Sequence, residues 1–357
     1  MQNGFRCGGC EMVYKIDRVL VRRVVVVLMA VGFMGMLGSF LHKKLFPKNV
    51  LNSRFSEVWY PRDPHALQTT ITTLFERAAE KYPRNSDQKY PWMICVPHAG
   101  YAFSGEIAAA GYQHLRGDAA KKIKRVIVLS PSHYIDFYGV CIPDFSHYQT
   151  PLGLAQVDTA MVKKIEQEEL MITHDTAFYR EHAIDVQIPW IQTCMPQAKI
   201  VPLIIGRVVG DDMVPHIGEI LSRYVDASTV VVVSTDFVHY GKRFEYYPFG
   251  TTKEATLQVD AVEQMIISVC CGLQRVSLEH VFAETKAAVC GKNVLKVACE
   301  LAARTITESS GNVKTLQECS QGICVALDDS FAIRERLGER LTEYERVGYA
   351  ALVFTVK

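Results

Sequence analysis

The sequence predicts an α/β protein, a single domain with a central mixed, largely parallel sheet flanked by helices. Three observations support this. Short, uninterrupted apolar runs recur along the chain, as in strands that are buried on both faces of a sheet. Segments with apolar residues at helical spacing separate most of these runs, which is the order of elements in α/β folds. No internal linker rich in Pro, Gly or Ser divides the chain. The runs are 93–96, 126–129, 200–205, 230–233 and 351–356.

The expected helices lie around and between these runs. Residues 66–82 form the clearest pattern, because their apolar residues repeat at helical spacing and predict one buried face. That face comprises Leu67, Ile71, Leu74, Phe75 and Ala78. Segment 305–345 is more polar, and we expect a loop at 308–312. The other helical patterns cover 108–115, 157–168, 216–224 and 253–268.

The N-terminus differs in kind from the rest of the chain. Residues 24–41 carry no charge, and arginines and lysines flank them. A helix of this length would span about 27 Å, close to the thickness of the bilayer's hydrocarbon core. We therefore expect a basic tail (1–23), a transmembrane anchor (24–41), a linker (42–52) and a globular domain (53–357). The domain is expected on the cytosolic side of a membrane. A start at Met29, Met34 or Met36 would instead give a soluble cytoplasmic protein.

Charge and cysteine usage exclude some classes of protein. The formal net charge is +1 and the basic residues are scattered, so we expect no nucleic-acid partner. The 11 cysteines are an odd number without regular spacing, which favours reduced thiols in a reducing compartment. Cys7 and Cys10 form one CxxC pair, but no second pair follows at the distance of a zinc ribbon.

Histidines follow three of the apolar runs. "MICVPHAGY" ends in a turn with His98, "VIVLSPSHY" in a turn with His133, and "VVVVSTDFVHYG" provides Asp236 and His239. A single histidine after a strand is usually a satisfied turn residue. In open α/β sheets, however, ligands bind beyond the carboxyl ends of the strands, where neighbouring turns converge. Imidazole suits iron, copper and zinc, so the repeated pattern indicates a metal site.

A carboxylate-rich segment and a thiol could complete this site. "EHAIDVQIPWI" provides Glu181, His182 and Asp185, and its carboxylates could accept the second N–H of a metal-binding histidine. The alternative for Glu181 is a surface pair or a helix cap. Cys290, in "AAVCGKN", is a candidate thiolate ligand, but the residues alone do not distinguish it from the other cysteines. A hydrolase nucleophile elbow and a phosphate-binding loop are absent.

Seven ordered motifs resemble the MEMO family (mediator of receptor-driven cell motility and its microbial relatives), which is similar in fold to LigB-like class III extradiol dioxygenases. The resemblance covers roughly residues 53–357 and excludes the N-terminus. The motifs are "PHAGYAFSGEIAA", "SPSHY", "TPLG", "EHAIDVQIPWI", "VPLIIG", "STDFVHYG" and "VCGKN".

The resemblance implies roles for particular residues. Iron or copper would be bound by His98, His133 and Cys290. Catalytic roles would fall on His239, Asp236 and Glu181, and ligand contacts on His182, Arg243 and Tyr101.

Three functions follow from these assignments. The first is a metal-dependent redox protein, which would make the chain an oxidoreductase. The second is a module that binds phosphotyrosine peptides. The third is a non-haem iron dioxygenase that cleaves a small aromatic substrate. A thiolate replaces the carboxylate of ordinary ring-cleaving sites, which weakens the third.

Overall fold

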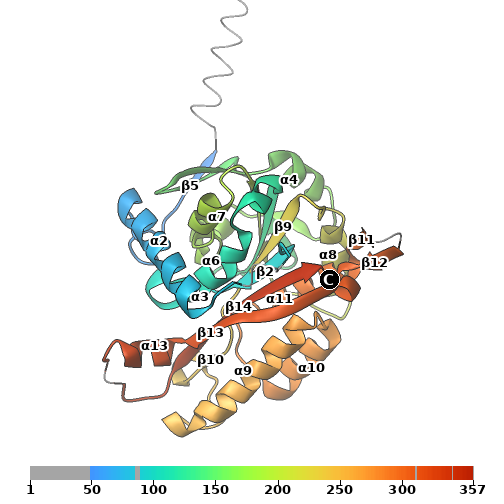
Figure 1. Ribbon diagram of the computed structural model, residues 1–357. Coiled ribbons are helices and arrows are strands. Elements are labelled where there is room, and N and C mark those ends of the chain that lie inside the picture. Colours follow the sequence, from blue (N-terminus) through green and yellow to red (C-terminus); the bar gives the residue numbers. More distant parts are fainter. Residues whose placement is uncertain (1–48, 85–88, 310–311, 340, 357) are drawn as a thin grey trace, which may run out of the picture. The chain divides into compact units, whose positions relative to one another are not determined.

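A computed structural model describes residues 49–84, 89–309, 312–339 and 341–356, which form one compact unit (Figure 1). The strands are β1 (Val50–Asn52), β2 (Met93–Val96), β3 (Arg125–Pro131), β4 (Val140–Ile142), β5 (His147–Thr150), β6 (Gly153–Gln156), β7 (Met171–Thr173), β8 (Lys199–Ile205), β9 (Thr229–Ser234), β10 (His239–Tyr240), β11 (Ile306–Ser309), β12 (Asn312–Thr315), β13 (Ser320–Asp329) and β14 (Arg346–Val356).

Helices connect most of these strands. The α-helices are α2 (Pro64–Lys81), α3 (Tyr101–Tyr112), α4 (Thr159–Ile165), α5 (Asp175–Arg180), α6 (His182–Asp185), α7 (Ile188–Cys194), α8 (Met213–Ser222), α9 (Thr256–Cys271), α10 (Arg275–Thr285), α11 (Lys292–Arg304), α12 (Leu316–Cys319) and α13 (Ser330–Arg336). The 3₁₀ turns are η1 (Gln113–Leu115), η2 (Asp118–Lys122), η3 (Lys242–Phe244) and η4 (Lys253–Ala255).

The central sheet is mixed, with a parallel middle. Among the described residues it has nine strands in the order β10-β14-β2-β9-β3-β8-β4-β7, and β13 pairs with β14 at one side. The contiguous strands β2, β9, β3 and β8 run parallel, while β14 is antiparallel to β2 and β4 is antiparallel to β8. Every residue of β2 and β9 is buried, which explains their uninterrupted apolar sequences.

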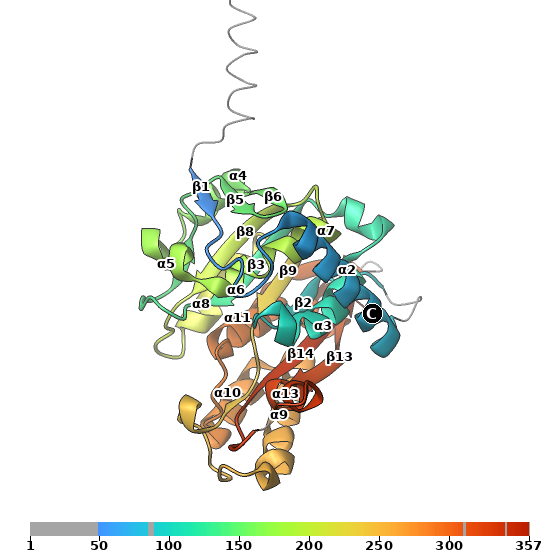
Figure 2. The same cartoon turned by 90° about the vertical axis from the view of Figure 1, so that its left-hand side faces the viewer.

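Helices cover both faces of this sheet. Helix α3 contacts β2 and β14 and packs against α2, whereas α11 contacts β3 and β9 on the other face and packs against α8 (Figure 1). A small sheet of β1, β5 and β6 lies at one end of the domain, and α9 and α10 lie at the opposite end (Figure 2). Strand β1, within the expected linker, pairs in parallel with β5.

The helix predicted at 66–82 is present as α2, with the predicted buried face. The Asp63 carboxylate caps its N-terminus by accepting a hydrogen bond from the Ala66 N–H at 2.8 Å, and Pro64 occupies its first turn. The prediction of a loop at 308–312 was wrong for residues 308, 309 and 312, which belong to the paired strands β11 and β12. A polar hairpin lacks the apolar run by which a strand is recognised in sequence.

The anchor predicted at 24–41, together with the tail before it, lies outside the described residues. Among the residues that the structure does describe, no helix combines the length and apolarity that a membrane crossing requires.

A buried ion pair joins the last strand to α9. Arg346 is 2% exposed and donates to the buried Glu263, and it also pairs with Asp260 at 2.5 Å. Glu263 in turn accepts the Val238 N–H at 3.4 Å, in the segment that leads to His239. This pair therefore connects the core to one edge of the candidate site.

Removing the guanidinium would leave the Glu263 carboxylate buried without its partner. We expect Arg346→Met to lower the free energy of unfolding by about 3–5 kcal/mol, measured by urea denaturation. Lys242→Met is the matched control, because its partner Glu343 is exposed, and it should cost less than about 1 kcal/mol. Equal stability of the two variants would contradict this account.

Candidate metal centre

Three neighbouring strands end at the same edge of the sheet. Val96 at the end of β2 pairs with Ser234 at the end of β9, and β3 runs parallel to β9 on its other side. The turns beyond these ends carry His98, Asp236 and His133. The predicted convergence of the strand ends is therefore present in the structure.

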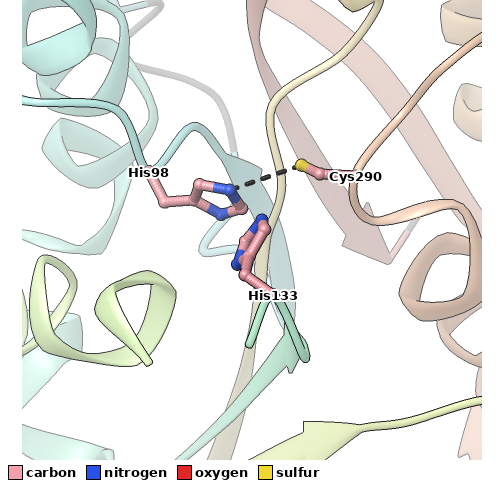
Figure 3. Close-up of side chains that lie close together, drawn as sticks. All are labelled: His98, His133 and Cys290. Atoms are coloured by element: carbon pink, nitrogen blue, oxygen red, sulfur yellow. Dashed lines mark hydrogen bonds between the residues drawn. The ribbon is translucent and has the colours of Figure 1, made fainter. Parts of the chain in front are cut away.

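Cys290 completes a group of three ligand-type side chains. The candidate ligand atoms of His98, His133 and Cys290 all lie within 4.8 Å of one another. The Cys290 Sγ is 3.3 Å from the His98 Nε2, and the two imidazoles meet edge to face with centroids 5.0 Å apart. Figure 3 shows the three side chains pointing toward one another from separate segments.

The loop before α11 brings Cys290 into this position. The next residue, Gly291, lies against Thr235, and a Cβ at Gly291 would be 2.2 Å from the Thr235 Oγ1. Only glycine permits that approach without a shift of the backbone. The same close packing places the Cys290 Sγ 3.7 Å from the Thr235 hydroxyl and 3.6 Å from the Asp236 carbonyl.

Glu181 fixes the orientation of His133. Its carboxylate accepts the His133 backbone N–H and the His133 Nδ1–H, each at 2.8 Å, and also the Ala183 N–H at 2.9 Å. Since Nδ1 donates to the carboxylate, Nε2 is the ring atom available to a metal. Burial opposes protonation of His133, but hydrogen bonds to Cys290 and Glu181 outweigh it and raise its pKa to about 10.

A second group of three ligand atoms shares one of these residues. Atoms of His133, Glu181 and His182 also lie within 4.8 Å of one another. Glu181 already accepts three hydrogen bonds, so it is better suited to orient His133 than to bind a metal itself.

Asp236 lies directly beside His98. Its Oδ1 accepts the His98 backbone N–H at 2.8 Å, and its Oδ2 is 4.0 Å from the His98 Nε2. Burial raises the pKa of this carboxyl to about 7, although the His98 N–H opposes the shift. Asp236 can therefore gain or lose a proton near neutral pH, which suits the acid/base role predicted for it.

His239 is held near the same edge on β10. Its backbone N–H donates to the Ala288 carbonyl at 2.8 Å, and its ring packs edge to face on Phe244. Within the described part of the chain, its buried Nε2 has no hydrogen-bond partner. Burial lowers the pKa of His239 to about 4, so the imidazole is neutral at pH 7.

Aromatic side chains lie beside the two candidate histidine ligands. His182 stacks on Trp59 with centroids 4.1 Å apart, and its Nδ1 lies 3.2 Å from the hydroxyl of Tyr134. Burial lowers the pKa of His182 to about 4. Trp59 and Tyr134 were not among the predicted site residues, because their role depends on contacts between segments far apart in sequence.

Two predicted ligand contacts lie apart from the three ligand-type side chains. Tyr101 is buried and donates its hydroxyl to the Val186 carbonyl at 2.8 Å. Arg243 is exposed and lies over the Phe244 ring, with its guanidinium carbon 4.7 Å from the centroid. Ligand binding by either residue stays a prediction.

A pocket of about 310 Å³ adjoins the candidate ligands. Both His133 and Cys290 line it, and an ion pair of 2.6 Å between Arg207 and Asp136 contributes two more lining residues. A small molecule in this pocket would therefore contact two of the three proposed ligands. The remaining lining residues are Pro131, Ser132, Tyr134, Ile135, Ile205, Gly206 and Asn293.

A family model described as "Memo-like protein" matches residues 53–321. The chain belongs to this family. The Memo family has the LigB-like fold, so the predicted family and fold class are both confirmed.

Curated relatives agree with this membership. The chain is 31% identical over 214 residues to the MEMO1 family protein MHO1 of Saccharomyces cerevisiae, covering 55% of this chain and 61% of the relative. It is 27% identical over 267 residues to the protein memo-1 homolog of Caenorhabditis elegans, covering 72% of each. The match thus spans less than two thirds of the yeast protein.

Among solved structures, the chain is similar to the crystal structure of an uncharacterized protein from Escherichia coli K12. The TM-score is 0.40 and the sequence identity 11%, and the match covers 73% of this chain and 99% of that one.

Burial of His182 predicts a pH-dependent contribution to stability. Its pKa is about 4 in the folded protein and about 6.5 when exposed. Above pH 6.5 both states are neutral. As the pH falls from 6.5 toward 4, only the unfolded chain takes up the proton, so the folded state is penalised.

We therefore expect the stability advantage of the wild type over His182→Gln to shrink by about 2–3 kcal/mol between pH 7.5 and 4.5. Urea denaturation of both proteins at the two pH values measures it. Subtracting the variant's free energy of unfolding from that of the wild type removes the contributions of other titrating groups, including Asp236 and Glu263. A difference that does not change with pH would show that His182 is not buried in neutral form.

Proposed function

We propose that this Memo-family protein is a metal-dependent redox protein that binds iron or copper through His98, His133 and Cys290. The observation that carries the proposal is the convergence of their ligand atoms within 4.8 Å. Two imidazoles and a thiolate are donors that suit copper and iron. The Glu181 carboxylate on His133 is the kind of outer partner that metal-binding histidines use.

The surrounding residues suit proton-coupled chemistry. A bound iron or copper ion would supply one-electron transfer and positions open to a small ligand. Asp236 would hold or release a proton beside His98, because burial brings its pKa to about 7. The neutral His239, whose buried Nε2 has no hydrogen-bond partner among the described residues, would accept a proton or orient a bound molecule. The adjoining pocket would admit that molecule at the side of His133 and Cys290.

Metal affinity of the whole chain tests this proposal. We expect reduced, anaerobic protein to bind iron(II) or copper(I), and His98→Ala and Cys290→Ser each to weaken binding by more than about 100-fold. The reason is that loss of outer partners alone costs about 10–100-fold. Dialysis followed by elemental analysis gives the affinities.

The matched controls replace an exposed residue of the same type. His65→Ala on α2 and Cys324→Ser on β13 should leave the affinity unchanged. The proposal fails if the wild type binds neither metal, or if the ligand variants bind as tightly as these controls.

A second candidate function is recognition of a phosphotyrosine peptide. It is favoured by one observation: exposed Arg243 stacks on Phe244, whose ring contacts His239 at a centroid distance of 4.9 Å. A guanidinium and a histidine that contact the same aromatic ring could receive a phosphate. Calorimetric titration with a phosphorylated peptide and its unphosphorylated twin tests it, and equal affinity would rule it out.

Ring cleavage is less favoured than either. A ring-cleaving iron site of this fold class uses two histidines and a carboxylate, and here Cys290 stands at the third position. The Asp236 carboxylate has an oxygen 4.0 Å from the His98 Nε2 and already accepts the His98 backbone N–H. The Glu181 carboxylate already accepts hydrogen bonds from His133 and Ala183.

A further inference from the structure

A buried chain of hydrogen bonds leads from α3 to His98. The Tyr112 hydroxyl donates to the Gln187 Oε1 at 3.0 Å, the Gln187 Nε2 donates to the Ser234 Oγ at 2.9 Å, and the Ser234 Oγ lies 3.1 Å from the His98 Nδ1. We call Tyr112, Gln187 and Ser234 the relay. All three are fully buried. Solvent therefore cannot rearrange these bonds, and their donors and acceptors can be assigned in turn.

The orientation of the Gln187 amide is determined by a carbonyl. Its Nε2 donates to the Pro97 carbonyl oxygen at 3.0 Å as well as to Ser234. A carbonyl can only accept, so a flipped amide would set two oxygens against each other at Pro97. The Tyr112 hydroxyl on the Oε1 is consistent with the same orientation. Both Nε2 protons are thus used, one on Pro97 and one on Ser234.

The Ser234 hydroxyl proton is then assigned as well. The Ser234 Oγ donates to the Ala183 carbonyl at 2.7 Å, and this acceptor is again a group that cannot donate. A hydroxyl has one proton, so toward Gln187 and His98 the Ser234 oxygen can only accept. The Nδ1 of His98 must therefore carry a proton.

We propose that the relay is a positioning device that fixes His98 as its Nδ1–H tautomer and thereby leaves the Nε2 lone pair directed at Cys290 and a bound metal. Tyr112, Gln187 and Ser234 touch no proposed ligand atom and act through His98. In neutral His98 one ring nitrogen is a donor and the other an acceptor, so protonation of Nδ1 requires an unprotonated Nε2. The Nε2 lone pair then faces the Cys290 Sγ, 3.3 Å away.

The two histidine ligands are oriented by different means. His133 donates to a carboxylate, Glu181, whereas His98 donates to a neutral hydroxyl. The Ala183 carbonyl holds the proton of the Ser234 hydroxyl, and the Gln187 Nε2 donates to its oxygen. The hydroxyl is therefore kept from turning and donating to Nδ1, which would select the opposite tautomer. The relay thus performs the orienting role of a carboxylate without placing another negative charge beside Asp236 and Cys290.

The tautomer can be measured without any metal. Histidine labelled with ¹⁵N in the whole, metal-free chain gives two-bond proton–nitrogen correlations that distinguish a protonated from an unprotonated ring nitrogen, and His98→Gln identifies the His98 signals. We expect Nδ1 protonated and Nε2 unprotonated in the wild type. Ser234→Ala should move His98 toward the Nε2–H form, because its Nδ1–H loses the acceptor. A wild-type His98 protonated at Nε2, or an unchanged tautomer in Ser234→Ala, would overturn the proposal.

Controls separate this effect from a general loss of packing. Ser104→Ala also removes a buried serine hydroxyl, which donates to the Ala99 carbonyl at 2.9 Å, and it should leave the His98 signals in place. If Ser234→Ala does not fold, Tyr112→Phe removes the outermost bond of the relay. It should give a smaller shift of the tautomer in the same direction, and no shift would overturn the proposal.

Metal affinity provides a second measurement, which rests on the proposed function. Ser234→Ala should bind iron(II) about 10–100-fold more weakly than the wild type or Ser104→Ala, as for other outer-partner variants. Equal affinity would overturn the relay's role in metal binding. If the wild type binds neither iron nor copper, the proposed function is contradicted instead. The tautomer measurement would still decide whether the relay acts on His98.

Discussion

The in-register parallel pairing of β2, β9 and β3 is the constraint on which the rest of the site depends. Parallel strands end at a common edge, so the turns that follow them emerge side by side. Residue 96 at the end of β2 lies opposite residue 234 at the end of β9, and β3 continues the same register on the far side of β9. A slip of one residue in either pairing would shift one strand along its neighbour and displace the turn that carries its candidate ligand. The apolar runs that form these strands therefore also determine where the imidazoles lie.

Burial is the second constraint, because each polar group at this edge must find a partner or remain neutral. His133 is the one histidine of the site whose pKa is raised, since Glu181 and Cys290 outweigh its desolvation, whereas burial lowers the pKa of His98, His182 and His239. The same burial raises the pKa of Asp236 toward neutrality. The centre thus combines one stabilised cation with several neutral imidazoles and an acid that titrates near pH 7. A metal cation bound at this site would have to displace the proton that Glu181 and Cys290 stabilise on His133.

The sequence predicted the strands that position the site better than it predicted the individual side chains of the site. The runs at 93–96, 126–129 and 230–233 are strands β2, β3 and β9, because a strand buried on both faces has a distinctive apolar pattern. His98 and His133 could be proposed from that pattern alone. Cys290 could not be proposed in this way, since cysteines look alike in sequence, and the family resemblance was needed to single it out. Ser234 was not predicted as a site residue for a different reason. Its proposed role depends on the Ala183 carbonyl, which is 51 residues away in sequence. The edge strand β13 was missed because its apolar run at 323–327 lies within segment 305–345, which is more polar as a whole.

The central claim is that Cys290, His98 and His133 together bind a metal ion, and X-ray absorption spectroscopy of the iron- or copper-loaded whole chain tests it most directly. This method distinguishes sulfur from nitrogen and oxygen in the shell around the metal. Our account predicts one sulfur and two imidazole nitrogens, with the sulfur lost in Cys290→Ser. A shell of nitrogen and oxygen alone in the wild type would contradict it, and would point to the neighbouring group of His133, Glu181 and His182 as the binding site.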